Sequence, residues 1–421
     1  MDVVHPRCAG IDCSKKDAKV CVRIQGQGGR ARSATVSTWG ATTGQILALR
    51  EHLIAAKVTC VVIESTSDYW KPFYYLLDDG LDVVLVNAAA VRNLPGRKTD
   101  VSDAAWLADL GAHGLVKASF VPPAPIRALR DLTRTRTVIT RERTREVQRL
   151  EKLLEDAGIK LSSVASQITG VSGRAMLEAL IAGQRDPATL ADLARRRMRS
   201  KIPALTEALT GRFGEHHAFM ARLFLDRVDA HSADIARLDE RIEAAMEPFR
   251  AARDLLISIP GFSRIVAEVF IAETGGDMSV FPSAGHLASW AGLSPGSNES
   301  AGRVKSTRTR PGNRYLKGVL GIAALAVARS KNTYFARSKN TYFSAKYKRI
   351  AARRGPMRAI VAVEHAMVIA AWNLLTNGDF YRDPGADYYT AHQPAAAKAR
   401  AVHQLQTLGY RVTLEPLADS A

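Results

Sequence analysis

The stretch CAGIDCSKKDAKVCVRIQ, residues 8–25, decides the fold of the amino-terminal part of the chain. Its two ends, CAGID and AKVCVRIQ, are short apolar runs, and the polar residues Lys15–Asp17 lie between them. A third run, RARSATVS at 30–37, follows the glycine-rich turn GQGG. Short apolar runs separated by turn residues predict strands, so this segment predicts a three-stranded antiparallel meander.

Beyond the meander, helical and strand-like segments alternate. The pattern predicts helices over 43–56, 70–79 and 102–110, and strands over 59–65 and 82–87. Three antiparallel strands followed by βαβα units are the order of a ribonuclease-H-like domain. The sequence therefore predicts an α/β, ribonuclease-H-like fold for residues 1–122.

The middle of the chain, 123–250, is predicted to be almost entirely helical. Val228, Ile235, Ile242 and Phe249 recur every seven residues. Such a repeat is typical of a coiled coil, within one chain or between chains, although an ordinary helical bundle gives a similar pattern.

The carboxyl-terminal part, 251–377, is predicted to be mostly α. Two helices meet at Pro260 and Gly261, as in a helix-hairpin-helix, whose free amides could hold a phosphate. A tight helix connection is the simpler interpretation of the same residues. The tail, 378–421, predicts a peripheral helix and a short strand.

The charge is unevenly distributed along the chain. The net charge is +18, and residues 300–363 contain sixteen Lys or Arg and no Asp or Glu. So long a segment without a carboxylate would repel itself, which indicates a nucleic-acid partner. We expect contacts to DNA or RNA from basic residues in the arginine-rich helix around 127–149 and in 303–358: Arg134, Arg136, Arg141, Arg145, Arg303, Lys305, Arg308, Arg310, Arg314 and Lys317.

The cysteines and apolar runs indicate where the protein works. Cys8, Cys13, Cys21 and Cys60 lie in strand-like surroundings without a C-x-x-C pair, as buried reduced thiols do. The run GVLGIAALAVA at 318–328 is too short to span a bilayer, and no signal peptide is visible. We expect a cytoplasmic protein that is not associated with a membrane.

Four carboxylates are candidates for a metal site. Asp12 and Glu64 end the first and fourth predicted strands, which are neighbours in a ribonuclease-H-like sheet, and Asp100 and Asp103 begin a helix on one face. Crowded carboxylates repel unless divalent cations lie between them, and two Mg²⁺ ions about 4 Å apart assist phosphoryl transfer. Taken singly, Asp100 could be a helix cap and Asp103 a first-turn residue favoured by the helix dipole.

The chain also contains a short duplication, RSKNTYFA at 329–336 followed by RSKNTYFS at 337–344. Eight residues turn a helix by about 2.2 turns, so an insertion of this length could misalign whatever follows. A solenoid needs a longer period, so this is a local tandem duplication.

Several motifs together resemble a known family. GID.SK, IE(S)T..Y and KTD..DA..LA in the first third, and L.SIPG, F.SA..LASWAGL.P, NESAG and GN..L further on, are similar to those of transposases of insertion-sequence family one-ten, the bridge recombinases, and their relatives the Piv-type DNA invertases. The match follows the family's order over nearly the whole chain.

The resemblance implies a mechanism and a set of partners. It implies a RuvC-like domain with a DEDD metal tetrad, here Asp12, Glu64, Asp100 and Asp103, and a transposase domain over 251–377 with a nucleophilic serine, here Ser300. It further implies Mg²⁺, two ions per site, and a covalent phosphoserine link to DNA. Donor and target DNA, an element-encoded guide RNA and a homodimer or homotetramer follow as partners, with the protein associated with the bacterial nucleoid.

Two features depart from the family's pattern, and two other functions are compatible with the residues. STSDYW follows Glu64 where the family more often has an Ala-Thr-Gly type turn, and the duplication begins about thirty residues after Ser300, which is compatible with a damaged copy. A RuvC-like junction nuclease would use water and tolerate Ser300→Ala. A noncatalytic nucleic-acid-binding protein would tolerate both Asp12→Ala and removal of Mg²⁺.

Overall fold

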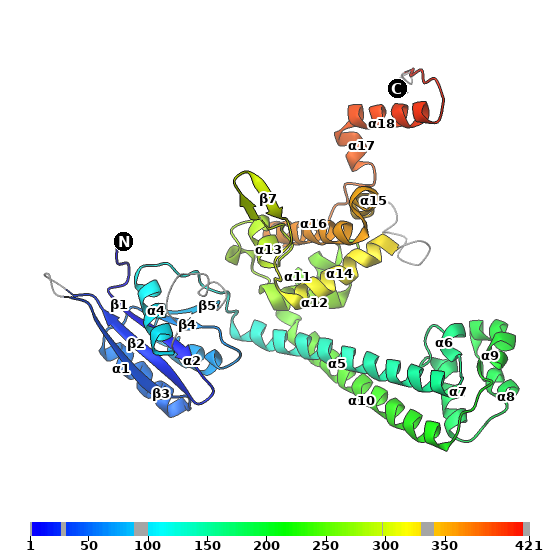
Figure 1. Cartoon of the computed structure of the whole chain (residues 1–421), viewed down its shortest axis with the longest axis horizontal. Coiled ribbons are helices and arrows are strands. Elements are labelled where there is room, and N and C mark those ends of the chain that lie inside the picture. The colour runs from blue at the N-terminus through cyan, green and yellow to red at the C-terminus, as the bar shows by residue number, and fades with distance from the viewer. Residues whose placement is uncertain (1, 27–30, 88–99, 297, 330–340, 416–421) are drawn as a thin grey trace. The chain divides into compact units, whose positions relative to one another are not determined.

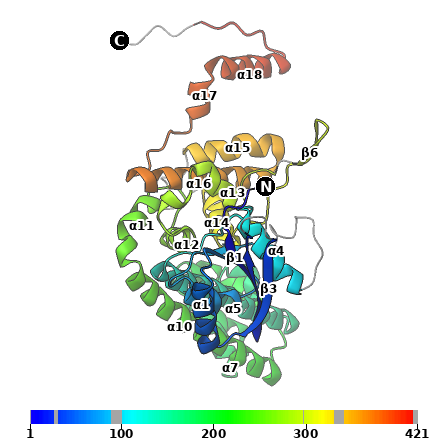
Figure 2. The same ribbon diagram turned by 90° about the vertical axis from the view of Figure 1, so that its left-hand side faces the viewer.

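A computed structural model describes residues 2–26, 31–87, 100–296, 298–329 and 341–415. The chain divides into two compact units, Met1–Val121 and Pro122–Ala421. Their elements are labelled in Figures 1 and 2, and each unit has its own architecture.

The first unit is built on a five-stranded mixed sheet. Its strands are β1 (Arg7–Cys13), β2 (Asp17–Ile24), β3 (Ser33–Gly40), β4 (Cys60–Glu64) and β5 (Val83–Val86). Their order across the sheet is β3-β2-β1-β4-β5. β1, β2 and β3 are antiparallel neighbours, whereas β4 is parallel to both β1 and β5. The predicted meander and the mixed α/β character of this unit are confirmed.

Helices cover both faces of this sheet (Figure 1). On one face, α1 (Thr43–Ala55) and α2 (Trp70–Leu77) pack against a core that contains Ile11 and Ile63. On the other face, α4 (Asp100–Ala112) packs against Cys8 and Val62 through Leu107. Because side chains alternate along a strand, Asp12 and Glu64 belong to the α4 face.

Two long helices, α5 (Ala124–Asp156) and α10 (Glu215–Ala245), pair side by side in the second unit. Arg136 contacts Asp239, and Asp156 contacts His217. As the position on α5 advances, the contact on α10 retreats, so the pair is antiparallel. The predicted helices therefore pair within one chain; Val228 and Ile242 of the heptad pattern are buried, while Ile235 is only partly so.

Separate hydrophobic cores lie at the two ends of this helix pair. At one end, Leu150 of α5 and Leu225 of α10 join a core formed with the small helices between them. These are α6 (Leu161–Val164), α7 (Val171–Ile181), α8 (Pro187–Asp192), the 3₁₀ turn η1 (Arg196–Lys201) and α9 (Ile202–Ala208). At the other end, Ile126 and Ile242 join the core of the carboxyl-terminal helices.

The carboxyl-terminal core is helical around α16, along which α15 packs (Figure 2). Its helices are α11 (Arg250–Ile257), α12 (Arg264–Thr274), α13 (Ala284–Trp290), α14 (Arg314–Arg329), α15 (Tyr342–Arg354) and α16 (Pro356–Asn377). A small hairpin, β6 (Asn298–Ser300) and β7 (Arg303–Ser306), precedes α14.

The turn between α11 and α12 is a tight helix connection. Gly261 has a φ of 92° and lies so close to α14 that an added Cβ would be 2.6 Å from the carbonyl oxygen of Ala323. The hydroxyl of Ser263 accepts the amide of Val266 at 3.4 Å and caps α12. The amide of Val266, one of those that could have bound a phosphate, is thus already hydrogen-bonded within the protein.

The tail consists of α17 (Tyr388–His392) and α18 (Pro394–Thr407). The helical part of the expectation is met, but the described tail, which runs to residue 415, has no strand. By length and composition, α16 is the one described helix that could cross a bilayer. Its Val363, Met367 and Ala371 are fully buried in the carboxyl-terminal core, where a soluble protein also places its most apolar helix.

Most of the RSKNTYF duplication lies outside the described residues, which resume at Thr341 in the second copy. There, the Thr341 hydroxyl accepts the amide of Ser344 at 3.3 Å and caps α15. Phe343 is 1% exposed and stacks on Tyr381 with 5.5 Å between ring centroids. The register of α15 is therefore fixed by its own cap and core contacts.

Candidate functional site

Asp12 and Glu64 occupy adjacent strands at the same edge of the sheet. The parallel register of β1 and β4 pairs Ile11 with Ile63, so the next residue on each strand is one of these two acids. Burial, followed by the negative charges of Asp12 and Glu64, raises the pKa of the neighbouring Cys13 thiol. Both carboxylates therefore lie close to one point at the carboxyl end of these strands.

Glycine lets α4 pack directly onto the backbone of β1. A Cβ on Gly10 would lie 2.2 Å from the Ala104 carbonyl oxygen, and one on Gly111 would lie 2.7 Å from the Cys8 sulfur. As β1 advances from Cys8 to Gly10, the contact on α4 retreats from Gly111 to Ala104. The first turn of α4, where the partly buried Asp103 lies, is accordingly directed toward the Asp12 end of β1.

The oxygen donors at this edge fit a hard divalent cation. Asp12 and Glu64 end parallel strands, and Asp103 begins the helix on the same face, which gives three carboxylates and no thiolate; Cys13 belongs to the opposite core. Among the described side chains, no three His, Cys, Asp or Glu form a ready metal cluster. The backbone of Asp100 begins α4, but its side chain lies outside the described set.

Ser300 lies at the end of an exposed hairpin in the second unit. The turn residues Ala301 and Gly302 have φ values of 50° and 71°, as in the type I′ turn that favours two-residue hairpins. Ser300 pairs directly with Arg303 across this turn. Because the Cβ atoms of directly paired residues lie about 5 Å apart, the side chains of Ser300 and Arg303 project from the same face of the hairpin.

The hairpin belongs to the segment between Gly292 and Gly312. The backbone at these two ends is in direct contact. A Cβ on Gly312 would lie 2.2 Å from the carbonyl oxygen of Ala291 and 2.6 Å from the amide nitrogen of Gly292. The ammonium of Lys317 donates to the carbonyl of Gly292 at 3.2 Å. The two ends of the segment are therefore fixed to each other, which presents the hairpin from a rigid base.

Next to this base lies the fully buried carboxylate of Glu273 on α12. Arg134 donates to both of its oxygens at 2.7 Å, and Asn313 donates to Oε2 at 2.6 Å. The Oδ1 atom of Asn313 in turn accepts the amides of Tyr315 and Leu316 and caps α14. One buried acid thus connects α5, α12 and the start of α14.

Comparison with known proteins identifies the family to which the chain belongs. Residues 9–159 match a family model for the DEDD transposase domain, and residues 253–340 match a model described as the transposase IS116/IS110/IS902 family. The chain belongs to the IS110 family of transposases. It is an enzyme that acts on DNA, and its DEDD domain implies the use of a divalent metal.

Two relatives support this assignment for the transposase. An insertion element IS900 protein of 42 kDa from Mycobacterium paratuberculosis is 28% identical over 364 residues, which cover 79% of this chain and 87% of the relative. The y4pF/y4sB protein of Sinorhizobium fredii (strain NBRC 101917 / NGR234), named as a transposase, is 27% identical over 184 residues, or 43% of each chain.

The basic residues predicted to contact nucleic acid fall into two groups in the transposase. Arg136 is 3% exposed and donates to Asp239 and Glu268 at 2.7 Å, so its prediction as a nucleic-acid contact is wrong in this fold. The guanidinium of Arg134 is hydrogen-bonded to the buried carboxylate of Glu273. The exposed group, with solvent-facing side chains, consists of Arg141, Arg145, Arg303, Lys305, Arg308, Arg310 and Arg314; Lys317 is partly buried.

Sequence reasoning missed Glu268 and Glu273 as organising residues. The available signal was two acids in the otherwise apolar helix RIVAEVFIAET, because an acid in a buried helix normally requires a basic partner. Asn313 was also missed, although Asn immediately before a helix is a typical cap.

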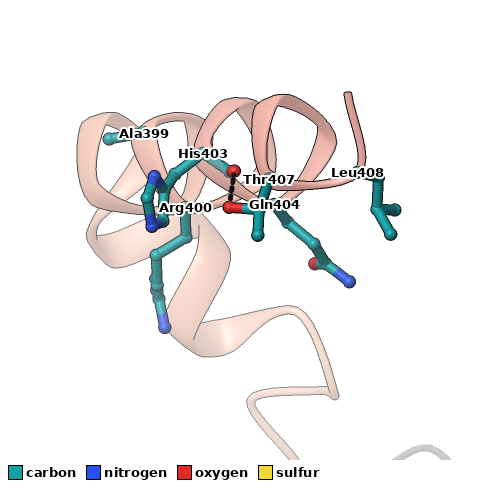
Figure 3. A pocket seen from close by; sticks show the side chains of 6 residues that line it. All are labelled: Ala399, Arg400, His403, Gln404, Thr407 and Leu408. Carbon is teal, nitrogen blue, oxygen red and sulfur yellow. Dashed lines mark hydrogen bonds between the residues drawn. The ribbon is translucent and has the colours of Figure 1, made fainter. Parts of the chain in front are cut away.

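A surface hollow along α18 is separate from these groups (Figure 3). The side chains that line it all come from this one helix: Ala399, Arg400, His403, Gln404, Thr407 and Leu408. The hydrogen bond drawn there, from the Thr407 hydroxyl to the His403 carbonyl at 2.8 Å, is internal to the helix. Because the lining contains no carboxylate and comes from one helix alone, we do not consider the hollow part of the transposase site.

Proposed function

We propose that this transposase cuts and rejoins DNA through a covalent link between Ser300 and a DNA phosphate. The observation that carries the proposal is the pairing of Ser300 with Arg303 at the tip of an exposed, rigidly based hairpin. A nucleophile that must reach a duplex has to project from the surface, and an adjacent guanidinium can bind the phosphate under attack.

In the proposed step, the Oγ atom of Ser300 forms a bond to phosphorus while one bond from phosphorus to a deoxyribose oxygen breaks. The hydroxyl proton leaves Oγ, and the departing sugar oxygen takes up a proton. The number of phosphate ester bonds is unchanged, so a second sugar hydroxyl can reverse the step and join a new strand without an external energy source. Arg303 holds the phosphate charge during both steps.

We further propose that Asp12, Glu64, Asp100 and Asp103 hold two Mg²⁺ ions in a ribonuclease-H-like domain. The strand order, with β1 central and parallel to β4, supports this fold, and the shared edge of Asp12 and Glu64 supports the site. Bound Mg²⁺ would neutralise charge on the reacting phosphate. The carboxylates and Ser300 must act on the same DNA phosphate, from one chain or from two.

The remaining parts of the proposal concern partners and organisation. We propose that an element-encoded RNA guides the choice of donor and target DNA, that the active form is a dimer or tetramer, and that the protein works at the bacterial nucleoid in the cytoplasm. Exposed arginines that suit phosphate contacts support a nucleic-acid guide. We retain a helical region over 123–250 and a catalytic serine domain over 251–377.

Covalent trapping tests the proposal. The protein is incubated with Mg²⁺, RNA from the flanking region and labelled donor and target DNA, then denatured and resolved on a gel. A protein-linked DNA band is expected for the wild type and for Ser306→Ala, which removes a hydroxyl from the same hairpin, and is expected to be absent for Ser300→Ala and Asp103→Asn. Cleaved ends without a linked band would instead indicate a hydrolytic nuclease, and binding without cleavage a noncatalytic protein.

A further inference from the structure

The small helical subdomain formed by α6 to α9 lies at the far end of the α5/α10 pair, with its own core (Figure 1). One matched family model ends at residue 159 and the other begins at 253, so neither covers it. Its sequence RRRMRSK, residues 195–201, contains five basic residues in seven. We call this segment the tip cluster.

Four arginines of the tip cluster point into solvent, and three lack partners in the described part of the chain. Arg195, Arg196 and Arg197 are exposed, and their guanidinium groups form no hydrogen bond or ion pair there. Arg199 approaches Asp192 at 3.8 Å, with both side chains more than half exposed, which is a weak surface pair. The cluster therefore carries nearly its full positive charge on the surface.

Several arginines of α5 are in the opposite state, although Arg141 and Arg145 of the same helix are exposed. Arg134 and Arg136 are paired with buried acids at 2.7 Å, and Arg143 donates to the Ser232 hydroxyl at 2.8 Å. An arginine that already has a carboxylate partner offers little net charge to a polyanion. Arg134, Arg136 and Arg143 therefore have structural roles in α5. The tip cluster, by contrast, is a basic surface whose arginines do not hold neighbouring elements together.

The backbone of the tip cluster is held firmly although its side chains are exposed. Its amide at Arg195 donates to the buried Ser172 hydroxyl at 2.9 Å, and the Lys201 ammonium donates to the Val164 carbonyl at 2.8 Å. The exposed arginines of the tip cluster are therefore presented from a backbone that is held at both ends.

We infer that the tip cluster binds the phosphate backbone of duplex DNA. DNA is the polyanion that the reaction of this transposase itself brings to the protein, and arginine is well suited to phosphate oxygens. The contact would position the DNA without reading its sequence, because it involves phosphates alone. It is independent of the proposed serine chemistry.

Binding of a 30-base-pair duplex of arbitrary sequence to the full chain, measured at several salt concentrations, tests the inference. The variant Arg195→Gln/Arg196→Gln/Arg197→Gln removes three charges from the tip cluster. The control Lys398→Gln/Arg400→Gln/Arg411→Gln removes three exposed charges from the tail. Each phosphate contact contributes about 0.9 to the slope of log K against log salt, so the tip variant should lower the slope by about 2 to 3 and the affinity about 10- to 100-fold.

Further variants and a second ligand distinguish this DNA contact from a general effect of net charge and from RNA binding. A triple Arg→Lys variant at the same three positions should keep the slope, since the charge remains, and Ser300→Ala should bind as the wild type does. An unchanged slope in the Gln variant with native melting behaviour, or an equal fall in the tail control, would overturn the inference. Loss of binding to a structured RNA of equal length, with duplex DNA binding intact, would overturn it as well.

Discussion

Asn313 donates its amide to Glu273 at 2.6 Å and thereby connects the cap of α14 to a fully buried acid on α12. Forty residues separate the two in sequence. The same carboxylate accepts hydrogen bonds from Nε and Nη2 of Arg134 on α5. The base of the Ser300 hairpin therefore depends on a charge that water does not reach.

Glu273→Gln should destabilise the second unit strongly. The substitution leaves Arg134 and the nearby Arg130 without their carboxylate; because Arg134 is 36% exposed, the cost is that of a lost charged hydrogen bond, about 1.5–3 kcal/mol. Chemical denaturation followed by circular dichroism measures the change. Glu240→Gln, on the exposed side of α10, should shift stability by no more than about 0.5 kcal/mol. Equal stabilities for the two variants would contradict the role given to Glu273.

Gly10→Ala should disrupt the first unit. The new Cβ would meet backbone atoms of α4 at 2.2 and 2.4 Å, and backbone cannot move aside as a flexible side chain can. A loss of about 2 kcal/mol or more is expected from thermal or denaturant unfolding. Gly44→Ala is the matched control, because nothing lies within 4 Å of its Cβ position in α1. It should be neutral or stabilise the protein by up to about 1 kcal/mol.

A divalent cation should stabilise the first unit through the carboxylate edge. Mg²⁺ or Mn²⁺ that binds only the folded state raises the unfolding free energy, by about 2.7 kcal/mol at a concentration one hundred times Kd. We expect a rise in melting temperature for the wild type and for Asp17→Asn, whose carboxylate bonds to Ser14 in the adjacent turn. Asp12→Asn should show no such rise; a rise equal to that of the wild type would place the cation elsewhere.

Glu364 should make stability depend on pH. Burial raises the pKa of this carboxyl on α16 to about 7, while the charge of Lys317 opposes the shift. Between the unfolded pKa near 4.5 and the folded value, only the unfolded state is ionised, so stability falls as pH rises through this window, by on the order of 3 kcal/mol in all.

Unfolding at pH 5 and pH 8 checks this prediction. Glu364→Gln cannot ionise, so it should remove most of the difference between the two pH values and be more stable than the wild type at pH 8. Glu240→Gln serves again as the exposed control and should retain the wild-type pH dependence. A wild-type protein that is equally stable at both pH values would show that Glu364 is not ionising on unfolding.

Local pattern was sufficient for much of the fold. The alternation in residues 8–25 predicts β1 and β2, and the β-rich and amphipathic runs up to Leu110 predict every later element described in the first unit. These elements are set by neighbouring residues, and the order of strands follows from simple connection rules. The adjacency of Asp12 and Glu64 follows from that order, because both end parallel neighbours.

Long-range pairing could not be predicted in the same way. The arginines of α5 resemble a solvated or nucleic-acid-binding face until their partners are known, and those partners, Glu268 and Glu273, lie more than 130 residues later. Periodicity records which side of a helix is apolar, but not which charged residue of another helix it meets. For this reason Arg136 was predicted as a contact for nucleic acid and is instead a buried structural residue.

The cap of α15 would be retained if one copy of the RSKNTYF duplication were lost. Loss of residues 329–336 leaves Thr-Tyr-Phe-Ser directly before Ala345, whereas loss of residues 337–344 leaves Thr-Tyr-Phe-Ala there. Loss of either copy would therefore shorten the chain before α15 without removing the threonine that caps this helix or the phenylalanine that fills its core position.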